Sequence, residues 1–151
     1  MSHLNLLREI KIENYYEKAV ICEDDIVFLE SKEYIFDSIQ AFLNDSNLEV
    51  LCLGYNERSK LQYNEHFYLT NNTQTTSSYM VKKTSINKLI NSFEISKKLL
   101  ELGFPGYVAA IDITWKYLQK KINFVIPKRR IVKQLEDSYS DIENKVVKYD
   151  V

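Results

Sequence analysis

The sequence predicts a mixed α/β fold, because short apolar segments rich in β-branched residues alternate with longer segments of helical periodicity. The first apolar segment, residues 19–22, ends abruptly at three consecutive carboxylates, as a strand buried on both faces of a sheet ends at its carboxyl edge. A helical segment and a second apolar segment, residues 49–53, follow. Strand, helix and strand in this order are typical of a parallel βαβ crossover, so we expect a mostly parallel sheet flanked by helices.

The N-terminal half is expected to contain two helices and two strands. Apolar residues at helical spacing predict a helix over residues 4–19, with Ser2 as its N-cap, that leads directly into the first strand. A second apolar face predicts a helix over residues 31–43. The strand at 49–53 follows, and the polar, aperiodic segment 55–65 is expected to be a surface loop.

The C-terminal half repeats this alternation in shorter pieces. Helices are expected at residues 84–102, with Thr84 as the cap, and at 112–120; strands are expected at 66–70, 77–81, 123–126 and 130–134. The tail from residue 135 is polar and is expected to be partly irregular.

The bulk composition is that of one globular domain without a nucleic-acid partner. With 151 residues, 45% hydrophobic and 27% charged, residues 1–151 are expected to form a single unit with its own core. The net charge is −1 and the basic residues are spread along the chain, which argues against nucleic acid and an anionic membrane surface as partners. For the one dense basic run, Lys128-Arg129-Arg130, a solvated start of a strand is at least as good an explanation as a phosphate contact.

Cysteine usage and hydropathy favour a reducing compartment. Cys22 and Cys52 each lie inside an apolar run, which suits small buried thiols better than a disulfide framework. No apolar segment approaches the roughly 20 residues that span a bilayer, and the N-terminus lacks the apolar core of a signal peptide. We therefore expect a cytoplasmic protein without a transmembrane segment.

The acidic cluster Glu23-Asp24-Asp25 is the strongest candidate for chemistry. Three adjacent carboxylates repel one another, and a divalent cation removes that conflict. In an extended segment Glu23 and Asp25 point to the same side, so they could share one hard ion whose other positions are filled by phosphate oxygens and water. The alternative is a solvated acidic turn that caps the next segment. The place of the cluster at the carboxyl edge of a strand, where open α/β sheets bind ligands, favours the ion.

Together with its neighbours, this cluster resembles the central signature of glycosyltransferase family 25, the lipooligosaccharide and collagen-type galactosyl- and glucosyltransferases. Ser2-His3-Leu4 ahead of a helix, and a hydrophobic strand that ends in the three acids, carry the first match. Further matches follow in the family's order: Leu51-Cys52-Leu53-Gly54, Ser78-Tyr79-Met80-Val81, Ala110-Ile111-Asp112, Pro127 with Gln134, and Ser140-Asp141-Ile142. The resemblance covers nearly the whole chain. The tail at 138–145 is especially similar to glycosyltransferase-like proteins of giant DNA viruses, for which the location would be the host cytoplasm.

The resemblance implies a GT-A-like fold and an inverting transfer of a hexose from a UDP-sugar to a hydroxyl of a glycan or protein, with Mn²⁺ or Mg²⁺ as cofactor. Asp25 would be the metal ligand, and Glu23 or Asp24 would touch the metal or the ribose. Asp112 would be the general base, because an inverting displacement needs a carboxylate to remove the acceptor proton opposite the leaving UDP. The alternative for Asp112, of equal weight, is a plain helix N-cap.

Several other residues have two competing interpretations. Gln134, Ser140 and Asp141 match the C-terminal motif of the family and could close over the nucleotide or add a metal ligand, although a turn before a helix explains them nearly as well. Tyr79 is expected to pack in the core. Trp115 could stack on a sugar face, but an aromatic residue at helical spacing is usually part of the core.

One departure from the family pattern leaves a second hypothesis open. Family members normally begin with a strand-helix-strand segment that carries a nucleotide-binding Asp-Arg motif, and it would precede Ser2. Without it the sheet would lack its first strands, and the chain could be inactive alone or completed by a second copy or another chain. The alternative function is therefore a non-catalytic remnant, or one part of a split glycosyltransferase, that acts as a binding or assembly module. A metal-dependent phosphohydrolase is a weaker third reading, because the sequence contains only two histidines for a two-metal site.

Overall fold

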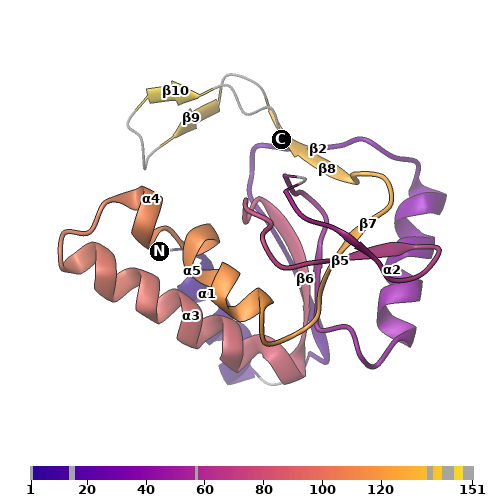
Figure 1. The fold of residues 1–151 in the computed structure, drawn as a ribbon, viewed down its shortest axis with the longest axis horizontal. Helices are drawn as coiled ribbons and strands as arrows, with labels where there is room; N and C mark the ends of the chain where they lie inside the picture. The colour runs from indigo at the N-terminus through magenta and orange to yellow at the C-terminus, as the bar shows by residue number, and fades with distance from the viewer. Residues whose placement is uncertain (1, 14–15, 57, 136–137, 141–144, 148–151) are drawn as a thin grey trace.

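The computed structural model describes residues 2–13, 16–56, 58–135, 138–140 and 145–147, which form a six-stranded sheet covered by helices on both faces (Figure 1). The helices are α1 (Ser2–Glu13), α2 (Lys32–Asn44), α3 (Lys83–Glu101), α4 (Gly106–Ala109) and α5 (Ile111–Gln119). The strands are β1 (Lys18–Cys22), β2 (Ile26–Phe28), β3 (Val50–Cys52), β4 (Leu61–Gln62), β5 (Phe67–Thr70), β6 (Ser78–Lys82), β7 (Phe124–Pro127), β8 (Val132–Gln134), β9 (Ser138–Ser140) and β10 (Lys145–Val147). The predicted mixed α/β class is confirmed.

The large sheet has the order β1-β6-β3-β7-β5-β4, and the prediction that it is mostly parallel is wrong. Only β3 and β7 pair in parallel among its described strands, whereas β6 pairs antiparallel with both β1 and β3. The expected crossover from β1 through α2 to β3 does return in the same direction. However, β6, which comes much later in the chain, lies between the two strands and is hydrogen-bonded to both.

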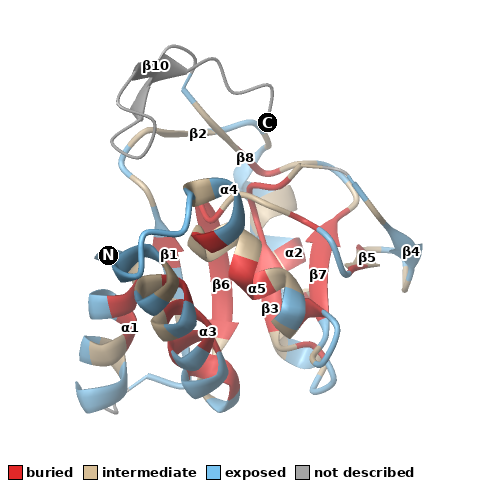
Figure 2. Ribbon diagram, turned by 60° about the vertical axis from the view of Figure 1, so that its left-hand side comes forward, coloured by how far each residue is buried: buried red, intermediate tan, exposed pale blue. Residues whose placement is uncertain are grey.

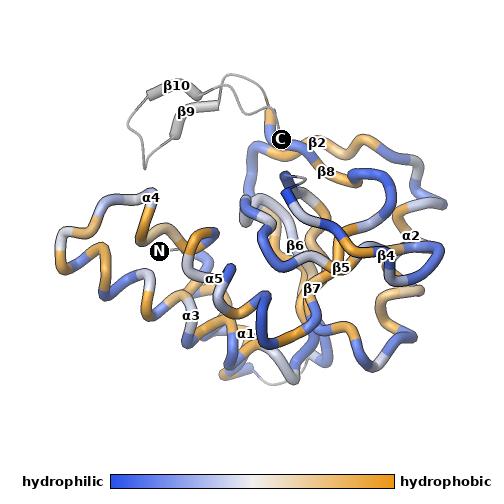
Figure 3. The backbone as a smooth tube through the Cα atoms, viewed as in Figure 1, coloured by the Kyte–Doolittle hydropathy of each residue, from blue (hydrophilic) through white to orange (hydrophobic). Residues whose placement is uncertain are grey.

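Two apolar clusters fill the spaces on either side of the sheet. On one face, α1, α3 and α5 pack against the sheet through residues such as Leu7, Phe93 and Trp115, which are fully buried. On the other face, Phe42 of α2 packs against a cluster that includes Leu51 and Val125. The central strands β6, β3 and β7 are almost entirely buried (Figure 2). Hydrophobic and hydrophilic stretches alternate along α3, as an amphipathic helix requires (Figure 3). The molecule is thus a three-layer α/β/α arrangement.

The first strand is an edge strand, which corrects two predictions. We expected β1 to be buried on both faces and the thiol of Cys22 to be buried. Instead, Ile21 is the one buried residue of β1, and Cys22 is exposed. The cluster beneath α2 includes residues of β3 and β6 but none of β1, so the second face of β1 stays uncovered. Cys52, in the interior strand β3, is buried as predicted.

Element boundaries differ from the prediction where distant contacts decide the backbone. The helix predicted to reach residue 19 ends at Glu13, and residue 18 pairs with Lys82 as part of β1. The predicted loop 55–65 contains the short strand β4, and residues 26–28 form β2, which pairs with β8. β2 depends on a partner far away in the sequence, so no local pattern indicates it. β4 forms a short hairpin with the neighbouring strand β5, within a polar segment that we expected to be a loop.

The basic run at 128–130 packs on aromatic rings of the fold. Its three residues each lie over a tyrosine: Lys128 Nζ is 3.4 Å from the ring centroid of Tyr68, Arg129 Cζ is 3.9 Å from that of Tyr34, and Arg130 Cζ is 5.3 Å from that of Tyr55. Arg129 also forms an ion pair with Glu30 at 3.2 Å. These contacts account for the run as a structural feature of the connection between β7 and β8.

Candidate active site

The acidic cluster lies at the sheet edge where β1 and β3 end and β6 begins. The backbone N–H of Glu23 donates to the carbonyl oxygen of Ser77 at 2.8 Å, which holds the cluster against the start of β6. Gly54, two residues after the end of β3, lies at the same edge. A Cβ atom at Gly54 would lie 2.5 Å from Ser77 Oγ, so a larger residue would require the Ser77 side chain to move.

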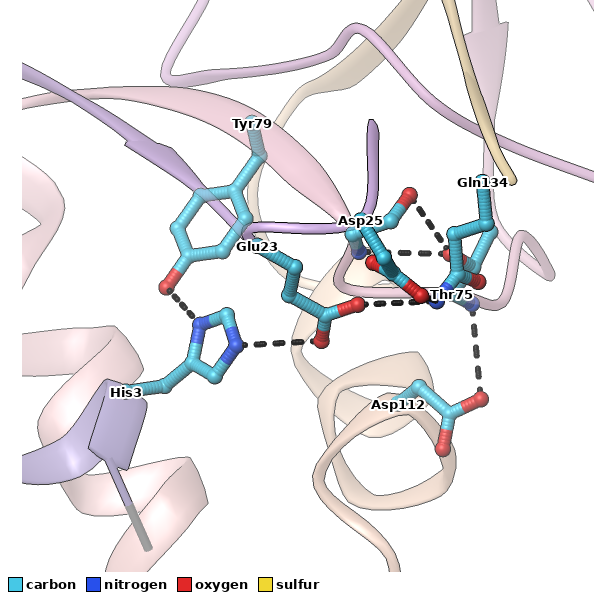
Figure 4. A network of polar contacts seen from close by, with 8 residues as sticks. His3, Glu23, Asp25, Thr75, Tyr79, Asp112 and Gln134 are labelled. Atoms are coloured by element: carbon cyan, nitrogen blue, oxygen red, sulfur yellow. Dashed lines mark hydrogen bonds and ion pairs between the residues drawn. The ribbon is translucent and has the colours of Figure 1, made fainter. Parts of the chain in front are cut away.

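Glu23 and Asp25 both contact Gln134, but not because the segment is extended as we expected: Asp24 and Asp25 form a turn between β1 and β2. Gln134 Nε2 donates to Glu23 Oε2 at 3.0 Å and lies 3.3 Å from Asp25 Oδ2 (Figure 4). The strand pair β2–β8 brings Gln134 there, because Ile26 is opposite Gln134 in that pair. Asp24, between the two acids, is exposed. The structure therefore brings together three of the residues that the resemblance selected.

Asp25 has one carboxylate oxygen that nothing in the described chain satisfies. Its Oδ1 atom is buried and has no hydrogen-bond partner among the described residues. A buried carboxylate oxygen without a partner is costly, and a hard cation would remove that cost. Among the described residues, no three His, Cys, Asp or Glu side chains are grouped closely enough to enclose an ion. The donor set fits an ion such as Mn²⁺ or Mg²⁺ that takes one or two protein carboxylates and completes its shell with phosphate and water.

His3 holds Glu23 from the opposite side, a contact that the sequence did not predict. His3 Nε2 lies 3.3 Å from Glu23 Oε1, and His3 Nδ1 lies 3.3 Å from the hydroxyl of Tyr79 (Figure 4). Burial raises the pKa of Tyr79, so its hydroxyl keeps its proton and can donate to Nδ1. The ring tautomer with a proton on Nε2 then donates to Glu23. Both oxygens of Glu23 thus have nitrogen partners, and the only sequence signal for this role was the Ser2-His3-Leu4 motif.

Asp112 joins the site through the loop before β6. It lies in the first turn of α5, and its Oδ2 accepts a hydrogen bond from the backbone N–H of Thr75 at 3.3 Å. The N-cap of α5 is Ala110, so the N-cap interpretation of Asp112 is wrong. Burial raises the pKa of Asp112; the Thr75 N–H and the charge of Lys116 oppose this, and the negative charge of Glu23 adds to it. A carboxyl group with a raised pKa is a stronger base than an exposed one.

The loop at 73–77 is fixed by the same helix that carries Asp112. Trp115 Nε1 donates to the carbonyl oxygen of Thr73 at 3.1 Å, and Gln119 makes two bonds to the backbone of Thr73, each of 2.9 Å. Thr75 has a φ of 69°, which is strained for a β-branched residue and is held by these surrounding contacts. Trp115 is fully buried, so it belongs to the core and not to a sugar-stacking surface.

The remaining predicted site residues lie at the C-terminal end. Ser140 is the last residue of β9, which pairs with β10. Asp141 lies outside the described residues.

Tyr79 is fully buried, as predicted for a core residue. None of the described helices is both long and apolar enough to cross a membrane.

Comparison with known proteins identifies one family. The family described as glycosyltransferase family 25 (LPS biosynthesis protein) matches residues 1–132. No curated protein matches the chain. The matched residues include His3, Glu23, Asp25 and Asp112, which are also those that the fold gathers around the sheet edge.

Proposed function

The chain belongs to glycosyltransferase family 25, and on this premise we propose that it transfers a hexose from a UDP-sugar to a hydroxyl group of a glycan or protein, with a divalent cation and with inversion of the anomeric carbon. The observation that carries the proposal is that Asp25 and Asp112 lie at the same sheet edge. Asp25 has a buried oxygen without a hydrogen-bond partner among the described residues. Asp112 accepts a hydrogen bond from the loop whose Ser77 contacts Glu23.

The donor side of the proposed site consists of the two carboxylates and Gln134. Asp25 Oδ1 would hold Mn²⁺ or Mg²⁺, with Glu23 as a second ligand or as the group that fixes the position of Asp25 through Gln134. When bound, the ion supplies positive charge to the diphosphate as it leaves. In this proposal exposed Asp24 contacts the ribose, and Ser140 and Asp141 close over the nucleotide, as the family motif implies.

The acceptor side depends on Asp112. The acceptor oxygen forms a bond to the anomeric carbon while the bond from that carbon to the diphosphate oxygen breaks, and UDP leaves with the electron pair. The hydroxyl proton passes to the carboxylate of Asp112. Burial supports this role because it raises the pKa of Asp112 toward the range in which a base works best. The Thr75 N–H fixes the direction of the carboxylate.

Release of UDP from a panel of UDP-hexoses tests this proposal. In the presence of Mn²⁺ and a set of saccharide acceptors, the chain should release UDP, and EDTA should abolish the release. Asp112→Asn should lower the rate by roughly 10²- to 10⁴-fold while UDP binding persists. Asp37→Asn, an exposed position on α2, is the matched control and should behave as the original chain.

Two outcomes would go against transferase activity. If Asp112→Asn and Asp37→Asn release UDP at the same rate, Asp112 is not the base. If the folded chain binds UDP with Mn²⁺ but releases none from any donor, the non-catalytic binding module is the better assignment.

A further inference from the structure

The surface next to α5 carries two adjoining hollows. The first, of about 420 Å³, is lined by Asn71, Asn72, Ile113, Lys116, Tyr117 and Lys120. The second, of about 410 Å³, is lined in part by Lys60, Thr70, Asn71, Lys120 and Asn123. Asn71 and Lys120 line both hollows, so the two lie side by side. We call the residues of both hollows together the α5 groove.

The α5 groove begins one helical turn from Asp112. Asp112, Lys116 and Lys120 follow one another at intervals of four residues, which places them along one face of the helix. The charge of Lys116 also acts on Asp112, in the direction that lowers the pKa of the carboxyl group. A molecule in the groove would therefore extend away from the proposed base along α5.

The lining of the α5 groove has the chemistry that binds sugar hydroxyls. Asn72 offers an amide that can both donate and accept hydrogen bonds. Asn71 Oδ1 already accepts from Ser59 and Asn123 Nδ2 already donates to Asn47, so these residues offer chiefly the amide nitrogen of Asn71 and the amide oxygen of Asn123. Thr70 is 5% exposed, and its hydroxyl has no partner among the described residues. Tyr117 is 70% exposed, although large aromatic side chains usually lie in a core. Lys120 Nζ lies over one face of its ring, 5.9 Å from the centroid, and the other face is the one for the C–H side of a pyranose.

The charge of the α5 groove is positive. Three lysines, Lys60, Lys116 and Lys120, line it, and among the described lining residues there is no Asp or Glu. Lys116 also lies close enough to Arg58 for the two charges to repel: its pKa is lowered first by burial and then by Arg58. A bound anion would relieve that repulsion.

We propose that the α5 groove is an acceptor site for an oligosaccharide that carries an anionic group, a carboxylate or a phosphate, close to the reacting sugar. Lys116 and Lys120 bind the anionic group, Tyr117 stacks on a sugar ring, and the asparagines bind hydroxyls. The identification of this ligand as the acceptor rests on the proposed transferase function. The binding of an acidic saccharide in the groove does not depend on that function.

Titration of the ¹⁵N-labelled full chain with trigalacturonate, in EDTA and without nucleotide, tests the groove alone. Saturable amide shifts are expected at residues 71–72 and 113–120, with at least about tenfold weaker binding of neutral maltotriose. Lys116→Ala and Lys120→Ala should each weaken trigalacturonate binding by about tenfold. Lys98→Ala, an exposed lysine of α3, is the charge-matched control and should bind like the original chain. Lys120 is exposed, so its replacement leaves the core intact.

Three results would overturn the proposal: no saturable shifts in the groove, equal affinity for inorganic phosphate, or an equal loss in Lys98→Ala. Equal affinity for phosphate would reduce the groove to a simple anion site. Asp25→Asn should bind trigalacturonate unchanged, since the experiment contains neither metal nor donor. A failure here can therefore be told apart from a failure of the proposed donor chemistry, which would leave these shifts in place.

Discussion

Glu23 and Asp25 are two residues apart, yet their carboxylates are satisfied differently. The two oxygens of Glu23 lie 3.3 Å from His3 and 3.0 Å from Gln134, whereas Asp25 keeps a buried oxygen without a partner in the described chain. Asp25, whose buried oxygen has a free electron pair, is the better candidate for a metal ligand. Glu23, which is held on both sides, is the better candidate for positioning that ligand through Gln134.

His3→Phe separates the positioning role of His3 from its packing. The phenyl ring can keep the stacking on Tyr79, whose ring lies 5.8 Å away at 20°, but it loses the contact with Glu23. Because outer-shell partners orient metal ligands, the affinity for Mn²⁺ with UDP should fall by about 10- to 100-fold. Isothermal titration calorimetry measures this change. His66→Phe, the other histidine, is the control, and equal losses in both variants would refute a specific role for His3.

The pH dependence of transfer tests Asp112 as the base. The carboxylate acts only when deprotonated, so kcat/KM should fall as the pH drops through the pKa of Asp112, which burial raises. Lys116→Ala removes a charge that lowers this pKa, so the acidic limb should move to higher pH. Lys121→Ala, an exposed neighbour, should leave the limb in place. An acidic limb that moves to lower pH in Lys116→Ala, or not at all, would contradict the assignment.

At the scale of single residues, the sequence predicted that Glu23 and Asp25 act together, but not for the reason given. Both acids contact Gln134, yet Asp24 and Asp25 form a turn, so the period of a strand does not account for their orientation. The contact of Asp112 with Thr75 spans 37 positions, and that of His3 with Tyr79 spans 76. Such contacts arise from how the sheet is assembled, so a local pattern cannot indicate them.

Among the elements, α5 has two roles, since it carries Asp112 and fixes the loop at 73–77. Gln119, at the end of this helix, is 4% exposed and binds both the N–H and the carbonyl oxygen of Thr73. The loop in turn gives Asp112 its N–H partner at Thr75. The packing of one helix is therefore coupled to the geometry of the proposed base.

Gln119→Leu should destabilise the chain by about 2 kcal/mol, because it leaves the buried N–H of Thr73 without a partner. Urea unfolding measures the free-energy change. The matched variant Gln40→Leu lies on the exposed face of α2 and should change the stability little. A Gln119→Leu variant as stable as Gln40→Leu would show that the loop does not depend on this residue.

The predicted elements agree with the structure where the pattern is local and differ where partners are distant. The amphipathic helices α2 and α3 lie within a residue or two of their predicted bounds, because helical periodicity is a property of one segment. The strand order was not predictable in the same way. Insertion of β6 between β1 and β3 depends on hydrogen bonds between separate parts of the chain, which makes the sheet mainly antiparallel.

In the whole molecule, β1, β3 and β7 run in one direction, so their carboxyl ends meet at the edge that carries Glu23 and Asp25. The sheet is thus the reason that distant segments contribute to one site. The GT-A-like fold and a second copy or partner strand beside the sheet remain predictions. A partner strand would have an available place at β1, which pairs only with β6 among the described strands.

Calorimetric titration of UDP into the chain, with and without Mn²⁺, tests most directly whether this edge holds a cation and a nucleoside diphosphate. UDP should bind with Mn²⁺ and fail to bind in EDTA. Asp25→Asn should bind at least about tenfold more weakly without a loss of thermal stability, because the neutral amide removes a buried charge. Asp37→Asn should bind like the original chain. UDP binding that is the same in Mn²⁺, in EDTA and in Asp25→Asn would contradict the account.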